Sequence, residues 1–315
     1  MSTPDVSVVV VSWQVRAFVQ RCLAALPAAL AGVSYEVILV DNASQDGTVA
    51  MVRERFPDVV VLENEVNVLY TRAANQGMAR ARARYVLLLN PDVVAHPGSL
   101  AYLVQYAEAH PEAGLLGPRI LNAEGEDDWR TGRAFPTPWS EFMDWSGAGR
   151  WFSFLPFLLK NRRLHYDRRS TSAVPLLSGA CLLFSFQLPL NLRKLNPEFV
   201  LYGEDIDLCR RVANAGWRRV LVAESVITHT GAASSQQRPA LAALMAIIAM
   251  NRYFRLWEGK KAAWLHRALL GLVGLFKTGL FCAGGPLRPA WHKKCALYRL
   301  VLCWASGCLA RFQVS

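Results

Sequence analysis

The first 90 residues alternate between short runs rich in β-branched residues and segments in which apolar residues recur at helical spacing. Residues 6–13 read VSVVVVSW, a valine-rich run of the kind that forms a strand buried on both faces. The same pattern predicts strands at 35–40, 58–63 and 84–90, helices at 15–26 and 71–83, and a turn followed by a helix within 45–56. This order predicts an α/β fold, with a mostly parallel sheet covered by helices on both faces.

Beyond residue 120 the alternation is less regular. Residues 122–172 mix glycine, proline, aromatic and charged residues too closely for long regular elements, so we expect a loop excursion there. Regular structure resumes near residue 173. The predicted elements are a strand pair or bent strand at 173–185, a helix at 204–216, and strands at 217–224 and 226–231.

Positive charge is concentrated in the C-terminal quarter of the chain. Residues 240–315 contain eleven lysines and arginines and a single acid, Glu258, so they supply ten of the eleven net positive charges. The remaining 239 residues are close to neutral. This contrast predicts a near-neutral body and a cationic C-terminal region. No recognised DNA- or RNA-binding motif accompanies the charge, so we expect no nucleic-acid partner.

The C-terminal region is also apolar. Residues 262–285 form an apolar stretch that His266, Arg267 and Lys277 interrupt, and residues 296–312 are similar. Because a spanning helix needs ~20 mostly uncharged residues, we expect amphipathic helices that lie in the surface of an anionic membrane. The alternative is a helical cap that packs on the body and keeps a solvated basic face.

Cysteine usage and the N-terminus indicate the cellular compartment. The seven cysteines form no CxxC pair, and we expect reduced, mostly buried thiols of a cytoplasmic protein. The N-terminus leads into the first strand without a basic segment, so we expect no signal peptide.

Polar residues follow the second and fourth predicted strands, at the sheet edge where α/β proteins bind ligands. The first cluster is DNASQDGT, residues 41–48, and the second is Asn90-Pro91-Asp92. Proline extends the backbone before it, so Asn90 and Asp92 leave on the same face. Their oxygens suit Mg²⁺ if a diphosphate completes the site. The alternative is an Asx turn that ends the strand.

Two further polar positions lie near the end of the body. Glu204 and Asp207 suit the first turn of a helix, where Asp207 can pair with Arg211, whereas Asp205 shares its helix face with apolar residues. A partly desolvated carboxylate has a raised pKa and can act as a general base near neutral pH. His229 ends a short strand, as either a structural residue or a ligand of a metal or phosphate. The sequence has no GxGxxG after its first strand and no P-loop, which disfavours dinucleotide oxidoreductases and P-loop NTPases.

Together these segments resemble the family 2 glycosyltransferases with the GT-A fold, and within them the rhamnosyltransferase-like branch. The resemblance covers residues 6 to about 235 and rests on SVVVVSW, VDNASQDGT, AANQGM, LLLNPDV, LLSGACLLF, YGEDIDLCRRVANAGW and ITHTGAASS. It implies residues 1–120 as a nucleotide-binding half and 121–239 as an acceptor-side half, followed by the C-terminal helical region from 240 to 315.

The resemblance also implies roles for individual residues. Asp205 matches the catalytic base, and Asp92 matches the metal-binding carboxylate of a D-x-D-type motif in which asparagine replaces the first aspartate. His229 matches a position that contacts the metal or the diphosphate. The residues implied at the nucleotide-sugar are Ser12, Asp41, Asn42, Ser44, Asp46, Arg72, Asn75 and Asn90.

The chain departs from the branch at one place. A Gly-Phe pair followed by small residues is usual there, but this chain has Leu69 and Tyr70 at the pair and Arg72 among the small residues. Arg72 is either a contact to the nucleotide or its phosphates, or a solvated helix arginine.

The function implied is inverting transfer of a sugar to an acceptor hydroxyl, with Mg²⁺ or Mn²⁺ as cofactor. The donor is a dTDP-, UDP- or GDP-sugar, with dTDP-rhamnose as the first guess. The acceptor is a glycan or a lipid-linked sugar in cell-surface polysaccharide synthesis, at the inner face of the cytoplasmic membrane. The alternatives are a nucleotide-binding membrane protein without activity and a sugar nucleotidyltransferase.

Overall fold

The computed structural model describes residues 3–148, 167–231, 239–283 and 290–308. Contacts within the chain divide it into unit 1, Met1–Ala134 and His165–Gln237, and unit 2, Phe135–Leu164 and Arg238–Ser315. Residues 135–148, expected in the acceptor-side half, thus group with the C-terminal helices. The predicted domain division stays a prediction, and about a third of the expected loop excursion, residues 149–166, lies outside the described residues.

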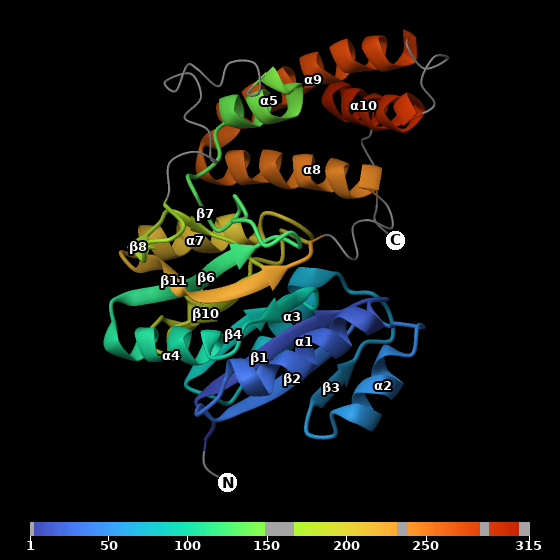
Figure 1. Cartoon of the computed structure of the whole chain (residues 1–315). Coiled ribbons are helices and arrows are strands. Elements are labelled where there is room, and N and C mark those ends of the chain that lie inside the picture. Colours follow the sequence, from blue (N-terminus) through green and yellow to red (C-terminus); the bar gives the residue numbers. More distant parts are fainter. Residues whose placement is uncertain (1–2, 149–166, 232–238, 284–289, 309–315) are drawn as a thin grey trace. The chain divides into compact units, whose positions relative to one another are not determined.

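Unit 1 is built on a nine-stranded mixed sheet (Figure 1). Its strands are β1 (Val6–Ser12), β2 (Tyr35–Asp41), β3 (Val60–Glu63), β4 (Tyr85–Leu89), β5 (Val93–Ala95), β6 (Ala113–Leu121), β8 (Ser172–Ala173), β10 (Cys181–Phe184) and β11 (Arg218–His229). The order across the sheet is β3-β2-β1-β4-β10-β6-β11-β5, with β8 beside β11. The first four strands of this order run parallel, and β10 runs antiparallel to both neighbours. The predicted α/β fold is confirmed.

Helices cover both faces of this sheet. The side chains of β1 point alternately to one face and to the other, so the strand packs against helices on both sides. Over the described residues of unit 1 the helices are α1 (Arg16–Ala29), α2 (Thr48–Arg55), α3 (Tyr70–Arg80), α4 (Ser99–Ala109) and α7 (Glu204–Asn214), with a short 3₁₀ helix at Leu190–Leu192. Val8 and Val10 belong to the same buried cluster as Val19 of α1. Val9 faces α3 instead, where Gly77 leaves room for its side chain. The core therefore has two layers of helix-to-sheet packing.

Several predicted boundaries differ from the observed ones. Helix α1 continues past Pro27 to Ala29, because its last turn packs Leu26 and Ala29 into the core. The two strands expected at 217–224 and 226–231 are one strand, β11, with an irregularity between Val222 and Val226. A second, two-stranded sheet joins β7 (Gly132–Arg133) to β9 (Leu176–Leu177), so part of the expected loop excursion is ordered.

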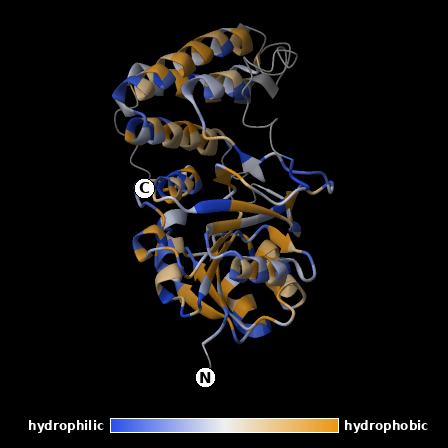
Figure 2. Cartoon of the chain, turned by 90° about the vertical axis from the view of Figure 1, so that its left-hand side faces the viewer, coloured by the Kyte–Doolittle hydropathy of each residue, from blue (hydrophilic) through white to orange (hydrophobic). Residues whose placement is uncertain are grey.

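In its described residues, unit 2 contains helices α5 (Pro138–Ser146), α8 (Pro239–Trp257), α9 (Gly259–Ala283) and α10 (Ala290–Ser306). They pack around an apolar cluster of Ile247, Leu270, Val273, Tyr298 and Val301. Figure 2, coloured by hydropathy, shows that the helices of this unit are largely apolar. The helical nature of the C-terminal region is therefore confirmed.

The cysteines only partly match the sequence-based expectation. Cys22, Cys181 and Cys209 are free and buried, as expected. For Cys282 and Cys295 the expectation of reduced thiols is wrong, since these residues form a disulfide with 5.7 Å between their Cα atoms. The pair was missed because its closeness depends on how α9 and α10 lie side by side, which residue spacing does not reveal.

The contact between α3 and β1 provides a stability test. A Cβ at position 77 would lie 2.4 Å from Val9 Cγ1 and 3.1 Å from Val40 Cγ2. We expect Gly77→Ala to lower the free energy of unfolding by about 1–3 kcal/mol, because the helix must move away from the sheet. Chemical denaturation measures this loss. Arg80→Ala, an exposed position on the same helix, should change stability by less than about 0.5 kcal/mol. An equally stable Gly77→Ala chain would contradict this packing.

Candidate active site

The antiparallel pairing of β5 with β11 brings Asp92 and His229 together. His229 is in register with Val93, the residue after Asp92. The backbone N–H and the hydroxyl of Thr230 both donate to the carbonyl of Asp92, at 3.2 Å each. His229 Nε2 lies 3.2 Å from Asp92 Oδ1, and both side chains are 7% exposed. The two predicted metal ligands thus form one buried pair.

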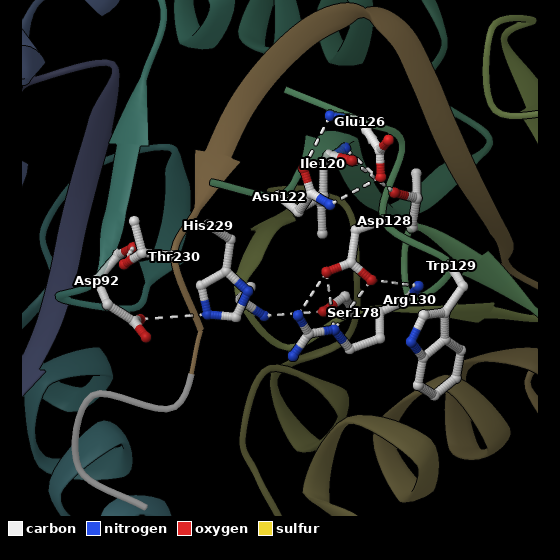
Figure 3. A network of polar contacts seen from close by, with 12 residues as sticks. Asp92, Ile120, Asn122, Glu126, Asp128, Trp129, Arg130, Ser178, His229 and Thr230 are labelled. Carbon is white, nitrogen blue, oxygen red and sulfur yellow. Dashed lines mark hydrogen bonds and ion pairs between the residues drawn. The ribbon is translucent and has the colours of Figure 1, made fainter. Parts of the chain in front are cut away.

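His229 lies between Asp92 and a second charged pair (Figure 3). Arg130 donates through its guanidinium and its backbone N–H to the Asp128 carboxylate. Burial alone would raise the pKa of Asp128, but the hydrogen bonds from Arg130 and the positive charge of its guanidinium lower it. His229 Nδ1 is buried and has no hydrogen-bond partner in the described part of the chain. The pair therefore adds an anion and a cation beside His229.

The turn before β10 connects this cluster to Asp205. The backbone N–H of Asn90 donates to the carbonyl of Ala180 at 2.9 Å, and the neighbouring N–H of Gly179 donates to Asp205 Oδ2 at 3.2 Å. Arg133 Nη2 also lies 3.2 Å from Asp205 Oδ2, and the N–H of Ile206 donates to Oδ1. One turn thus contacts both the end of β4 and the carboxylate that opens α7.

Glu204 and Tyr70 are two further titratable residues whose pKa values respond to Asp205. Burial, and then the charge of Asp205, raise the pKa of Glu204 to about 8. Burial likewise raises the pKa of Tyr70 well above its usual value, with further contributions from Glu204, Asp205 and Asp92. Glu204 Oε2 and the Tyr70 hydroxyl are both buried without a hydrogen-bond partner among the described residues. All three carboxylates therefore act electrostatically on the Tyr70 hydroxyl.

The polar residues after β1 and β2 form a single hydrogen-bonded platform. Ser12 Oγ donates to Asp41 Oδ1 at 2.7 Å, and the N–H of Ser44 donates to Asp41 Oδ2 at 2.7 Å. Asn42 accepts a bond from Asn64. Burial alone would raise the pKa of Asp46, but hydrogen bonds from Thr48 and Arg16 lower it. These bonds fix the loops, and the predicted contacts of these residues with a nucleotide stay predictions.

The other residues implied at the donor, Asn75, Arg72 and Asn90, do not share one hydrogen-bond network. Asn75 exchanges two hydrogen bonds with the backbone of Leu195, at 2.8 and 2.9 Å, so its amide holds α3 in place. Arg72 is exposed on α3. Asn90 is half-buried and its backbone bonds to the turn before β10. Contacts of Arg72, Asn75 and Asn90 with the donor all stay predictions.

The Asp92–His229 pair fits a divalent cation in part. A carboxylate and an imidazole are ligands that Mn²⁺ accepts, and the unpartnered Nδ1 shows that His229 is not fully used by the fold. Among the described residues, no group of three or more His, Cys, Asp or Glu side chains could hold a metal ion. Two protein ligands leave other coordination positions for substrate oxygens, as is usual for cations that act on diphosphates.

Sequence reasoning missed four residues of this group: Tyr70, Arg130, Arg133 and Glu204. Arg130 and Arg133 lie in the segment that was expected to be a loop excursion, and their only signal was the basic pair within DDWRTGR. Glu204 was assigned to the helix dipole alone, yet burial gives it a strongly raised pKa.

The raised pKa of Glu204 predicts a pH-dependent effect on stability. Its folded-state pKa of about 8 lies above the ordinary value of 4.5, so the stability it contributes is full below pH ~4.5 and is lost as pH rises through ~8. Glutamine cannot ionise. We therefore expect the melting temperature of Glu204→Gln, relative to wild type, to rise between pH 5 and pH 9. Glu54→Gln, at an exposed position, is the control, and a pH-independent difference for Glu204→Gln would contradict the prediction.

Comparisons with known proteins agree on the family. The family model Glycosyl transferase family 2 matches residues 7–188. The chain is 30% identical over 251 residues to N-acetylglucosaminyl-diphospho-decaprenol L-rhamnosyltransferase of Mycobacterium tuberculosis. The matched region covers 76% of this chain and 80% of that protein. The uncharacterized protein y4gI of Sinorhizobium fredii is 32% identical over 87 residues, or 26% of this chain and 10% of that protein.

Among solved structures, the crystal structure of GalNAc-T7 with UDP, GalNAc and Mn²⁺ matches with a TM-score of 0.51. The match covers 72% of this chain and 44% of that chain, at 15% identity, so it shows likeness of fold alone. Because the family model spans more than half of the chain and the mycobacterial relative most of it, the protein belongs to glycosyl transferase family 2.

Proposed function

We propose that the protein is an inverting glycosyltransferase that moves a sugar from a nucleotide-sugar to an acceptor hydroxyl, with Asp205 as general base. The observation that carries the proposal is the turn before β10. It contacts the Asp205 carboxylate through Gly179 and the end of β4 through Ala180. The candidate base thus lies on one side of the turn, and the strand end that leads into the Asp92–His229 pair lies on the other, which suits a reaction in which the nucleophile and the leaving group lie on opposite faces of a sugar.

The step is a single displacement. Asp205 accepts the proton of the acceptor hydroxyl while that oxygen forms a bond to the anomeric carbon. The bond from the anomeric carbon to the diphosphate oxygen breaks, and the nucleoside diphosphate leaves with the electron pair. Gly179, Ile206 and Arg133 hold the Asp205 carboxylate in one orientation. Positioned proton transfer of this kind typically contributes a factor of roughly 10²–10⁴ in rate.

Asp92 and His229 would hold Mg²⁺ or Mn²⁺, which when bound offsets the negative charge of the leaving diphosphate. Arg130 lies near the same place, since a Cβ on Gly231, two residues after His229, would meet its guanidinium at 3.4 Å. Its positive charge suits a diphosphate oxygen. Arg133 stays with Asp205 and balances its charge within the site.

The choice of donor and acceptor follows the mycobacterial relative. Its name states an L-rhamnosyl product on a decaprenyl-diphosphate-linked N-acetylglucosamine. We therefore take dTDP-rhamnose as the first donor to test, ahead of UDP- and GDP-sugars, and a polyprenyl-diphosphate-linked N-acetylglucosamine as the first acceptor. A lipid-linked acceptor requires an enzyme at a membrane, and we place this one on the inner face of the cytoplasmic membrane, in surface polysaccharide synthesis.

Asp205→Asn tests the proposed base. We expect the variant to bind the nucleotide-sugar with nearly unchanged affinity and to transfer sugar roughly 100- to 10,000-fold more slowly, because asparagine cannot accept the proton. Calorimetric binding and chromatographic product analysis measure the two effects. Asp58→Asn removes an exposed carboxylate and should leave both unchanged.

Two outcomes would contradict the proposal. Near-normal turnover by Asp205→Asn would remove Asp205 from the role of base. Release of pyrophosphate instead of a nucleoside diphosphate by the wild-type chain would identify a sugar nucleotidyltransferase.

A further inference from the structure

Helix α9 exposes a continuous apolar face. Six of its large apolar side chains are 45–71% exposed, and their spacing follows the helical period, which places them on one side of the helix. They are Trp264, Leu265, Leu272, Leu275, Phe276 and Leu280, and we call this surface the α9 face. Monomeric soluble proteins rarely expose contiguous apolar surface of this kind, and such surface marks an interaction site.

The polar residues that interrupt the apolar stretch of α9 point the other way. Arg267 donates to the carbonyls of Ala305 and Trp304 at 2.9 and 2.7 Å. Lys277 donates to the carbonyl of Trp145 at 2.9 Å and lies 3.2 Å from the Tyr298 hydroxyl. Both cations are therefore turned into unit 2, away from the α9 face.

His266 follows the same rule. It is fully buried, and its Nδ1 lies 3.2 Å from the side-chain nitrogen of Asn251. A helix on the surface of a water-soluble domain shows the opposite arrangement, with its apolar side inward and its charges in water. The orientation of α9 thus suits a surrounding less polar than water.

Exposed basic side chains lie at the start of α9 and on α8 and α10, the two long helices that pack against it. Lys260 and Lys261 are exposed in the first turn of α9, and Lys294 and Arg299 are exposed on α10. Helix α8 adds exposed arginines at 252 and 255. Cations beside an apolar face match the layered chemistry of a bilayer surface, where anionic headgroups lie above hydrocarbon.

The exposed cations also indicate whether α9 crosses a bilayer or lies on its surface. In the described part of the chain, residues Gly259–Cys282 of α9 are the only helical segment long and apolar enough to cross a membrane, by length and composition. If unit 2 spanned, its exposed cations on α8 and α10 would enter hydrocarbon, which is costly. If only the α9 face is immersed, the exposed cations of α8 and α10 can stay at the level of the headgroups.

We propose that the α9 face is embedded in the hydrocarbon boundary of an anionic lipid bilayer, with α8 and α10 at the headgroups. The proposal rests on the membrane location given under the proposed function and refines it, but it involves no residue of the active site. The vesicle-binding test can therefore fail while the proposed glycosyl transfer holds. Likewise, the proposed transfer can be wrong while the vesicle-binding test succeeds.

The test compares vesicle binding by the full chain and by Leu272→Gln/Phe276→Gln, which removes apolar surface without changing charge. On co-sedimentation with vesicles of phosphatidylcholine and phosphatidylglycerol, we expect the double variant to bind at least about tenfold more weakly. Leu190→Gln is the matched control, because Leu190 is 79% exposed in unit 1, and it should bind like wild type. Circular dichroism verifies that all three chains are folded.

A second measurement locates the face directly. Brominated acyl chains should quench tryptophan fluorescence of wild type more than that of Trp264→Phe, because residue 264 is 70% exposed on the α9 face. Equal vesicle binding by wild type and the double variant would overturn the proposal. So would a soluble dimer that binds no vesicles and dissociates in the double variant, since a second copy would then cover the face.

Discussion

The candidate active site depends on the antiparallel pairing of β5 with the end of β11. A three-residue strand, Val93–Ala95, adds to the edge of the sheet beside the last residues of β11, and this pairing sets Asp92 against His229. Both side chains are buried. The hydrogen bonds from Thr230 to the Asp92 carbonyl hold the two chain segments together at this point. A shift of one residue in register would turn His229 to the other side of the sheet.

The loops around the site are held in backbone conformations that side chains normally avoid. Where the structure describes the chain, four non-glycine residues have φ between 55° and 68°, and each adjoins a segment that contributes to the candidate site: Gln14, Ala43, Leu69 and Tyr202. Such conformations cost on the order of 1–3 kcal/mol each, and they persist only where the surroundings hold them. The hydrogen bond from the Gln14 backbone to Ser44 is one such restraint. The body of unit 1 thus stabilises strained loops at the edge where ligands bind.

The sequence predicted the parallel half of the sheet well, because the valine run of β1 and its neighbours carry a strong periodic signal. The family resemblance implied that Asp92 and His229 serve one metal; the structure places the two side chains 3.2 Å apart, and their role as ligands stays a prediction. The sequence could not predict Arg130, Arg133 or Glu204, because their roles depend on contacts between distant segments. Arg133 reaches Asp205 across 72 positions, and Glu204 acquires its raised pKa from burial. Periodicity shows which face of an element is apolar, but not which polar groups become desolvated together.

The central claim is that Asp92 and His229 act as one cation-binding unit. Mn²⁺ binding in the presence of saturating dTDP, followed by electron paramagnetic resonance, tests it with Asp92→Ala, His229→Ala and the double variant. If the two side chains hold one ion, the double variant should bind Mn²⁺ no more weakly than the worse single variant, because either loss already breaks the unit. Additive losses, or single variants that bind like wild type, would contradict the account.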